Sequence, residues 1–372
     1  MYSIWEKNSF THYDCIIIGS GILGLSTAIS IKERSPSTEI LILERGTLPS
    51  GASTKNAGFA CFGSLTEILS DIKRNGESET VSLVEKRWKG INMLRQRLGD
   101  EKMGLLNYGG SELLKENNIA ALDEIGHVNH LLRNIFDSDT FVADERKINE
   151  FGFNKDVVKS LVFSPFESQI DTGVMMRSLI AMAQSKGVMI INNYDAVIDD
   201  YSANTVKVSA KNSGVTFTSN KLISCSNAFT SSILPQIMIK PGRGQVIATK
   251  PVAGLQFKGV FHMDEGYYYF RNYGERIIFG GGRNLDFTGE ETSEFGTTDM
   301  IIESLKDILR EVILPGREFE VEMTWSGIMG FNESKLPEII QISDNITAGF
   351  CCNGMGVALA SYVAEQLSES GS

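Results

Sequence analysis

The stretch YDCIIIGSGILGLSTAIS, Tyr13–Ser30, constrains the fold of this chain more than any other segment. Residues Cys15–Ile18 are apolar and mostly β-branched, which favours a short buried strand, and Ile22–Lys32 is typical of a helix. The run EILILE, Glu39–Glu44, predicts a second buried strand of the parallel kind. A strand, a helix and a strand within about 30 residues predict a β-α-β unit.

Three glycines inside this stretch, Gly19, Gly21 and Gly24, form the pattern G-x-G-x-x-G directly after the first strand. In such a turn the first glycine permits the tight bend, the second lets the backbone approach a pyrophosphate, and the third lets the helix pack on the strand. The helix N-terminus offers free N–H groups to the anion. Glu44 follows about 20 residues later, where a carboxylate accepts ribose hydroxyl protons. The unit predicts a dinucleotide site but does not separate NAD from FAD, since both contain the same adenosine diphosphate half.

The composition narrows the classes of partner and location. The net charge of −11 argues against nucleic acid as a partner, because proteins that bind a phosphate backbone usually present a basic face. The chain has neither the pattern of a signal peptide at its N-terminus nor an uninterrupted apolar run long enough to cross a membrane. We therefore expect a cytoplasmic protein without an integral membrane segment. The odd number of cysteines indicates a reducing compartment and buried thiols: Cys15, Cys61, Cys225, Cys351 and Cys352.

The rest of the chain alternates between segments with a helical pattern and segments rich in strand-forming residues. Apolar residues at helical spacing predict two helices within Leu65–Leu98, separated near RNGESE, and one amphipathic helix over Asp299–Ile313. The region from GRGQVIATK to IIFGGG is rich in strand-forming residues. Because α/β segments at the start, middle and end are separated by mixed segments, we expect two interwoven domains.

Six further motifs resemble, in order, those of the D-amino-acid oxidase / glycine oxidase / sarcosine oxidase (DAO) family of FAD-dependent oxidoreductases. The loop SGASTKNAGFA, Ser50–Ala60, resembles the flavin-facing loop of that family. The other motifs are SQIDTGVMMRSLIAMAQSKGV, KLISCSNAFTSSILP, YYYFRNYGERIIFGGGRN, WSGIMGFNESKLPEI and GFCCNGMGVALAS. The hairpin YYFR…IIFGGGR is most similar to the gamma-glutamylputrescine-oxidase-like branch, which oxidises longer amines.

The resemblance implies an α/β fold in which a Rossmann-type FAD-binding domain is interwoven with an α+β substrate domain on a mainly antiparallel sheet. The expected FAD-binding domain comprises residues 10–70, 155–235 and 325–372, and the substrate domain comprises 71–154 and 236–324. Relatives with covalent flavin use a cysteine near Trp325, and this chain has none there, so we expect non-covalent FAD.

The resemblance also implies a set of FAD-binding residues. Gly19, Ser20, Gly21, Ile22, Gly24, Glu44 and Arg45 would hold the adenosine and pyrophosphate side, Val197 would meet the adenine through its backbone, Asn227 and Ala228 would lie near the pyrophosphate, and Ser53, Asn56, Ala57 and Gly58 would line the flavin. Gly354, Met355, Gly356 and Val357 open the last predicted helix, whose N-terminus would face the flavin N1/O2 edge, where reduced flavin carries negative charge.

The expected reaction is oxidation of a C–N bond in a small amine or amino acid, by hydride transfer to flavin N5 and hydrolysis of the imine. We expect the substrate pocket to include residues of Tyr267–Phe270. Alternation sends Tyr267 and Tyr269 to one face of the strand and Tyr268 and Phe270 to the other, one set facing the flavin and the other the core, and we favour Tyr268. Arg271 and Arg283 are candidates for binding a carboxylate. His262 precedes the hairpin and is a weaker candidate.

Two departures from the family leave alternatives open. Met329 and Gly330 stand where amino-acid-oxidising relatives often carry an arginine that binds the substrate carboxylate. The apolar stretch Ile277–Phe279 stands near the place where sarcosine-oxidase relatives carry a lysine that promotes reaction with oxygen. The electron acceptor, oxygen or another, therefore stays open. Two other functions also stay open: a hydroxy-acid dehydrogenase acting on a C–O bond, and a non-catalytic flavin-binding subunit.

Overall fold

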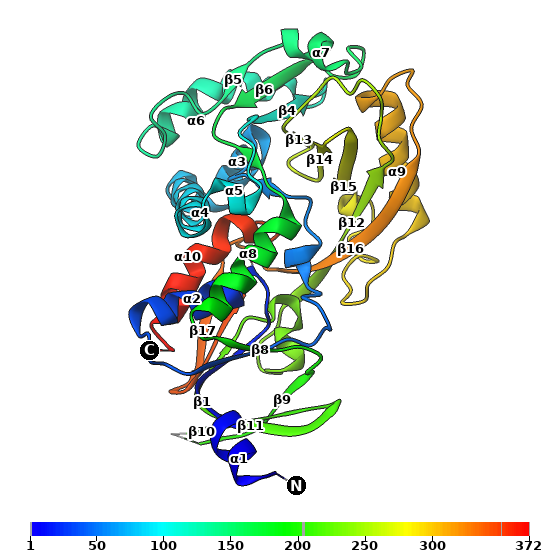
Figure 1. Ribbon diagram of the computed structural model, residues 1–372. Coiled ribbons are helices and arrows are strands. Elements are labelled where there is room, and N and C mark those ends of the chain that lie inside the picture. Colours follow the sequence, from blue (N-terminus) through cyan, green and yellow to red (C-terminus); the bar gives the residue numbers. More distant parts are fainter. Residues whose placement is uncertain (1, 203–204, 351, 372) are drawn as a thin grey trace.

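The computed structural model describes residues 2–202, 205–350 and 352–371, so that Cys351 lies outside the described residues. Two eight-stranded sheets dominate these residues (Figure 1). The first contains the predicted β-α-β unit, with β1 at His12–Ile18, α2 at Ile22–Arg34 and β2 at Ile40–Leu43. The predicted α/β class is confirmed, as a mixed fold with large mixed sheets.

The first sheet has the strand order β17-β18-β11-β1-β2-β8, and β9 and β10 extend from β11. Parallel pairing joins β18, β11, β1, β2 and β8 in turn, and β17 pairs antiparallel at the edge. The bounds of the further strands are β8 (Met189–Ile191), β9 (Ala196–Ser202), β10 (Thr205–Ala210), β11 (Ser213–Ser224), β17 (Glu338–Ser343) and β18 (Ile346–Phe350).

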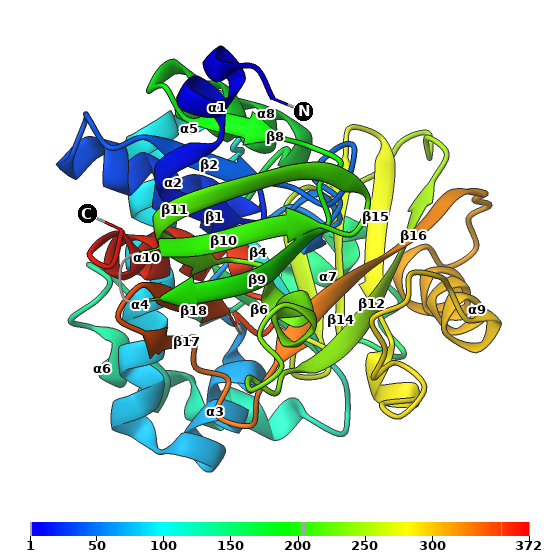
Figure 2. The same cartoon turned by 90° about the horizontal axis from the view of Figure 1, so that it is seen from below.

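Both faces of this sheet are buried, which explains why the second half of β1, Cys15–Ile18, is apolar without interruption. Cys15 and Ile17 point to one face, where four helices pack: α2, α4 (Glu77–Leu98), α8 (Thr172–Ser185) and α10 (Gly356–Ser368). Ile16 and Ile18 point to the opposite face, toward apolar residues of β10 and β11. Figure 2 shows β9, β10 and β11 as a meander covering that side.

The second sheet has the order β16-β12-β15-β14-β13-β4-β6-β5, with every neighbouring pair antiparallel except β13 and β4. Its strands are β4 (Gly110–Leu114), β5 (Val142–Ala143), β6 (Ser160–Ser164), β12 (Lys240–Thr249), β13 (Val260–Met263), β14 (Tyr268–Tyr273), β15 (Arg276–Gly281) and β16 (Val321–Phe331). One face packs on α9 (Asp299–Ile308) through an apolar cluster that includes Phe270, Phe279 and Leu305. The predicted helix over Asp299–Ile313 thus forms in its first part, and Leu309–Ile313 continues it as a wider π-type turn.

The remaining elements connect the two sheets. The predicted pair of helices within Leu65–Leu98 is confirmed, because α3 (Leu65–Asn75) ends at Gly76, whose φ of 83° breaks the helix before α4. The other short elements are α1 (Ile4–Phe10), α5 (Asp100–Met103), α6 (Ile125–Leu132), α7 (Arg146–Phe151), β3 (Phe59–Ala60), β7 (Ser168–Gln169) and the 3-10 helices Ala52–Thr54, Ile119–Glu124, Asn227–Ser232 and Arg283–Leu285.

Several expectations stay predictions. The domain bounds stay a prediction, and the strands show which sheet each segment enters. β6, within the expected FAD-binding segment 155–235, joins the second sheet, and β16 contains the expected bound at residue 325. Within the described part of the chain no helix is long and apolar enough to span a bilayer. Among the described cysteines, Cys15, Cys61 and Cys225 are buried free thiols and Cys352 is a partly buried one.

Candidate functional site

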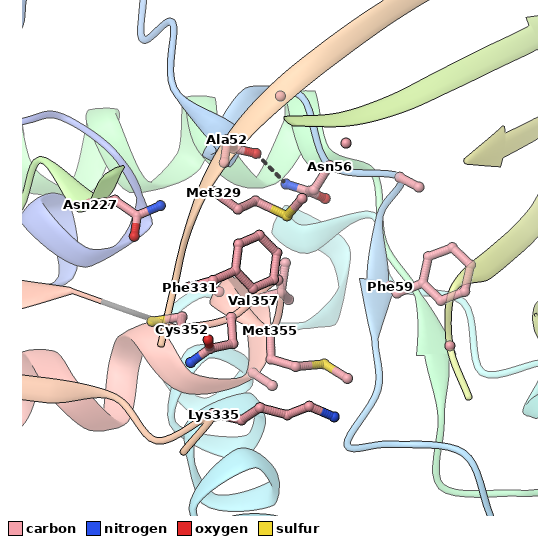
Figure 3. Close-up of a pocket in the computed structure, with 18 of the residues that line it drawn as sticks. Ala52, Asn56, Phe59, Asn227, Met329, Phe331, Lys335, Cys352, Met355 and Val357 are labelled. Carbon is pink, nitrogen blue, oxygen red and sulfur yellow. Dashed lines mark hydrogen bonds between the residues drawn. The ribbon is translucent and has the colours of Figure 1, made fainter. Parts of the chain in front are cut away.

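A cavity of about 800 Å³ lies between elements of the two sheets. The N-terminal turn of α2, the Ala52–Ala57 loop and the N-terminal turn of α10 line one part of it. The second sheet contributes residues of β12 to β16, among them Val246, His262, Tyr269 and Met329. In Figure 3, Asn227 lies on one side of the cavity and Phe59 on the other, with Met329 and Phe331 in view between them. The size and mixed lining are typical of a small-molecule or cofactor site.

The glycine turn has the close contacts that its sequence predicts. Gly19 has a φ of 104°, which disfavours any residue with a side chain. A Cβ on Gly24 would lie 2.0 Å from the Gly19 carbonyl oxygen, so only glycine lets α2 start this near the strand end. A Cβ on Gly21 would lie 2.8 Å from Ser53 Oγ, in the wall of the cavity.

Glu44 is tied to this turn by its own hydrogen bonds. Its Oε2 accepts from the Ser20 amide at 3.0 Å and from Ser20 Oγ at 2.8 Å, and its Oε1 accepts from the Gly46 amide at 2.9 Å and weakly from Ser50 Oγ at 3.4 Å. A carboxylate has about four acceptor positions, so these bonds use them all. A ribose hydroxyl would therefore have to replace one of the serine hydroxyls.

The Ala52–Ala57 loop is held from both sheets. Ser53 Oγ accepts from the Ile22 amide at 2.9 Å, and Asn56 Oδ1 accepts from the Gly58 amide and from Thr172 Oγ1, both at 2.9 Å. From the second sheet, Trp325 Nε1 donates to the Lys55 carbonyl at 2.9 Å. The loop is therefore fixed against the start of α2, where a bound dinucleotide would pass.

Asn227 adopts a φ of 49°, in the left-handed region, which asparagine tolerates better than most residues with a side chain. It lines the cavity beside Gly330, where a Cβ would lie 2.7 Å from Asn227 Oδ1. Gly354, with a φ of 87°, precedes α10 and lines the cavity together with Met355, Gly356 and Val357. Two helix N-termini, of α2 and α10, thus border one cavity.

The predicted FAD-binding residues fall into two groups. Those that line the cavity are Gly21, Ile22, Ser53, Asn56, Ala57, Asn227, Gly354, Met355, Gly356 and Val357. Those that lie outside its lining are Gly19, Ser20, Gly24, Glu44, Arg45, Gly58, Val197 and Ala228. Arg45 stacks on the Phe229 ring at 4.0 Å, and Val197 lies in β9. Glycine-lined walls and two helix N-termini suit an elongated dinucleotide, while the role of each residue stays a prediction.

Tyr268 is not part of this cavity, contrary to our preference for it. It is buried and packs in the apolar cluster under α9 with Phe270 and Phe279. Tyr269 lies on the other face of β14 and lines the cavity. The alternation of the strand was correctly expected, but the sequence does not say which face meets α9, because both faces carry aromatic residues.

Arg271 also lies outside the cavity lining. Its side chain is buried, its Nε donates to the Ala57 carbonyl, and a Cβ on Gly58 would lie 2.8 Å from Arg271 Nη2. Burial lowers the pKa of this guanidinium to about 10, with Asp171 partly opposing the effect. Arg271 therefore joins β14 to the Ala52–Ala57 loop, and this candidate for the substrate carboxylate does not line the cavity.

Arg283 does line the cavity, in the short helix that follows β15. Its guanidinium stacks on Phe331 at 4.1 Å and on Phe287 at 5.2 Å. Its Nε is buried without a hydrogen-bond partner, and no carboxylate among the described residues lies within ion-pair distance of it. Burial lowers the pKa of Arg283, which costs free energy that an anionic ligand would offset.

Several cavity residues carried no signal in the sequence or only a weak one. Besides Tyr269, these are Phe59, Glu67, His262, Met329, Phe331 and Lys335. Tyr269 has a hydroxyl with no hydrogen bond to any other described group, and burial raises its pKa to about 12, so it is a neutral donor at neutral pH. The alternation of β14 together with the apolar face of α9 identifies Tyr269, whereas the others depend on contacts between distant segments.

The comparison with known proteins agrees with this geometry. A family model described as "FAD dependent oxidoreductase" (DAO) matches residues 14–370. The chain is similar to the probable oxidoreductase OrdL of Haemophilus influenzae, with 23% identity over 382 residues covering 96% of this chain and 83% of that protein. L-proline dehydrogenase of P. horikoshii has a similar structure, with a TM-score of 0.77 and 15% identity over 96% of this chain and 93% of that one. Glycine oxidase of Bacillus cereus gives a TM-score of 0.75 and 16% identity over 96% and 97%.

Proposed function

The chain belongs to the DAO family of FAD-dependent oxidoreductases, and from that premise we propose that it oxidises a C–N bond of a small amine or amino acid. FAD supplies the hydride acceptor, flavin N5, and the imine product hydrolyses in water. The protein's own part is to bind the substrate, orient the carbon that carries the hydride and limit the access of water.

The observation that carries the proposal is the pair of unsatisfied polar groups on the second-sheet side of the cavity. Among the described residues, the Arg283 guanidinium has no ion-pair partner and the Tyr269 hydroxyl has no hydrogen bond. A guanidinium binds a carboxylate by two parallel hydrogen bonds, and a phenol donates one more. This pairing supports a substrate with a carboxylate, held by groups other than the arginine that Met329 and Gly330 replace.

Around these polar groups the cavity is apolar and aromatic. Met329 and Phe331 come from β16 and Phe59 from β3. The Phe331 ring lies over Gly242, where a Cβ would be 2.4 Å from the ring. Such walls exclude water and strengthen the few polar contacts that remain.

For the cofactor we propose non-covalent FAD along the cavity. The pyrophosphate would lie at the N-terminus of α2 and near Asn227, and the flavin between the Ala52–Ala57 loop and the N-terminus of α10. Amide donors at the start of α10 would then stabilise the negative charge of the reduced flavin. We also propose the predicted division into an FAD-binding domain and a substrate domain. The final electron acceptor is oxygen or another oxidant.

Anaerobic mixing of the yellow holoprotein with a panel of amines, amino acids and hydroxy acids tests the proposal, with flavin absorbance as the signal. Bleaching by an amine or amino acid supports it, and peroxide formed on readmission of air identifies an oxidase. Bleaching by hydroxy acids alone would favour C–O oxidation. A flavin that dithionite reduces but no member of the panel does would favour a non-catalytic flavin-binding subunit.

A further inference from the structure

A buried histidine–carboxylate pair lies in the cavity wall and has no part in the contacts assigned above. His262 Nε2 is 2.9 Å from Glu167 Oε2, and both side chains are buried, with 5% and 2% of their surface exposed. His262 comes from β13 and lines the cavity, while Glu167 directly precedes β7. A pair taken so far from water costs free energy, so a role beyond stability is worth testing.

The position of the imidazole is fixed by its neighbours. The Phe59 ring meets the His262 ring edge-on at 5.4 Å, and the same Phe59 ring meets Tyr269 edge-on at 5.7 Å. His262 and Tyr269 are directly opposite in the register of β13 and β14. The histidine and the tyrosine hydroxyl therefore belong to one stretch of wall, with Phe59 packed against both.

The electrostatic surroundings are mostly acidic. Glu167, Glu67 of α3 and Glu112 of β4 act on His262. The Cys61 thiol lies within 4.8 Å of both members of the pair, and the Arg87 guanidinium acts on that thiol. Burial lowers the pKa of His262, but the three carboxylates outweigh it and raise that pKa above its ordinary value. Arg87 lies 3.5 Å from Glu67 and is shared with Asp71, so it offsets only part of the negative charge.

We propose that His262 is the base that takes a proton from the ammonium group of the substrate. A cationic ammonium does not release a hydride readily, because its nitrogen lone pair is occupied by the proton. With Nε2 engaged by Glu167, ring atom Nδ1 is the acceptor: the substrate N–H bond breaks, its electron pair stays on nitrogen, and Nδ1 gains the proton. The neutral amine, with its lone pair free, is the form from which a bound flavin would take the hydride. This inference rests on the proposed C–N oxidation and adds a residue to it.

Glu167 is the positioning residue of the pair. Its carboxylate fixes which ring nitrogen carries the proton in the neutral imidazole and stabilises the imidazolium after proton transfer. Glu167 Oε1 is buried and has no hydrogen-bond partner within the described part of the chain, so no donor there competes for the second oxygen of the carboxylate. Loss of this charge makes the imidazole a weaker base without removing it.

Histidine-selective NMR of the holoprotein tests the pair without any substrate. The chain has four histidines, and His127, which lies 3.0 Å from Glu77 at the surface, provides a matched histidine–carboxylate pair. In Glu167→Gln we expect the His262 pKa to fall by about one pH unit or more. In Glu77→Gln the His262 pKa should stay as in the wild type, because water screens the charge of an exposed carboxylate. A His262 pKa that is insensitive to Glu167→Gln would overturn the role of Glu167.

Rapid-reaction kinetics test the base itself, with whichever amine bleaches the flavin. The rate of flavin reduction should rise with pH through the His262 pKa, and Glu167→Gln should move this rise to lower pH. His262→Asn should remove the rise and slow the reduction about 100-fold or more near neutral pH. Reduction by an amine with an unchanged pH profile in His262→Asn would overturn the inference and leave the proposed function intact. Failure of every amine to bleach the flavin, with the NMR result as expected, would instead overturn both the base role and the proposed C–N oxidation and leave only the pair's coupling.

Discussion

Tyr268 and Tyr269 are neighbours in the chain but have opposite surroundings. Tyr268 packs under α9 in an apolar cluster, and Tyr269 lies across Gly280 with its hydroxyl 2.8 Å from where a Cβ on that glycine would be. A glycine at this position leaves room for the ring, which is why the tyrosine can lie flat along the cavity wall. The hydroxyl belongs to a residue of the cavity lining and has no hydrogen bond to another described group, so it is available to a ligand.

Tyr269→Phe should weaken the binding of a carboxylate ligand while leaving the fold unchanged. Loss of one hydrogen bond to a charged carboxylate costs about 1.5 kcal/mol, so we expect a dissociation constant about ten-fold higher, measured with benzoate by the shift of the flavin spectrum. Tyr268→Phe is the matched control and should leave this constant unchanged. An effect of Tyr268→Phe alone would contradict the placement of the two rings.

Arg283→Met should affect the same ligand more strongly, because a charged partner is lost. We expect a cost of about 2 kcal/mol or more, or about 30-fold in the dissociation constant of benzoate. Arg276→Met is the control, since Arg276 bonds the Thr249 carbonyl and Glu322 at the edge of the hairpin, away from the cavity lining. Equal losses in both variants would show that Arg283 acts only through overall charge.

At the scale of elements, α4 and α10 pack closely against each other at Gly90. A Cβ on Gly90 of α4 would lie 1.9 Å from the carbonyl oxygen of Ala358, in the first turn of α10. Ala358 itself lines the cavity. The glycine therefore sets how closely α4 packs on α10, and through this packing it sets the position of the helix start proposed to face the flavin.

Gly90→Ala should push α10 away and reduce both stability and affinity for FAD. Overpacking of this kind costs about 1–3 kcal/mol, which a lowered thermal midpoint and earlier release of flavin fluorescence on heating would report. Gly126→Ala in α6 is the control, because a Cβ there meets nothing within 4 Å. That change should be neutral or stabilising by up to about 1 kcal/mol. A Gly90→Ala protein that melts like the wild type would refute this close packing.

The sequence predicts elements whose signals are local. The β1-α2-β2 unit, the break between α3 and α4 at Gly76 and the strand alternation around Tyr269 all follow from composition and spacing. It does not predict which face of β14 is covered, since that depends on α9, which follows later in the chain. Nor does the sequence predict that Arg271, a candidate for the substrate carboxylate, donates to the Ala57 carbonyl, because the two residues are far apart in the chain.

At the scale of the whole molecule, the cavity is made by segments from both sheets. The Ala52–Ala57 loop meets Trp325 and Arg271 of the second sheet, while its Ser53 bonds the start of α2 beside the first. A ligand that fills this cavity contacts segments of both sheets at once. Its binding free energy should therefore stabilise the arrangement of the two sheets and not only one of them.

Removal of FAD should lower the thermal midpoint of the whole protein, and FAD added back should raise it. A ligand at 100 times its dissociation constant stabilises the native state by about 2.7 kcal/mol, and the gain grows with the logarithm of its concentration. Riboflavin, which lacks the adenosine diphosphate half, is the control and should stabilise far less if α2 holds the pyrophosphate.

Acid precipitation should leave the yellow colour in the supernatant, because we expect no covalent bond to the flavin. Colour retained in the pellet would contradict the non-covalent assignment, and equal stabilisation by riboflavin would contradict the placement of the pyrophosphate at Gly19–Gly24.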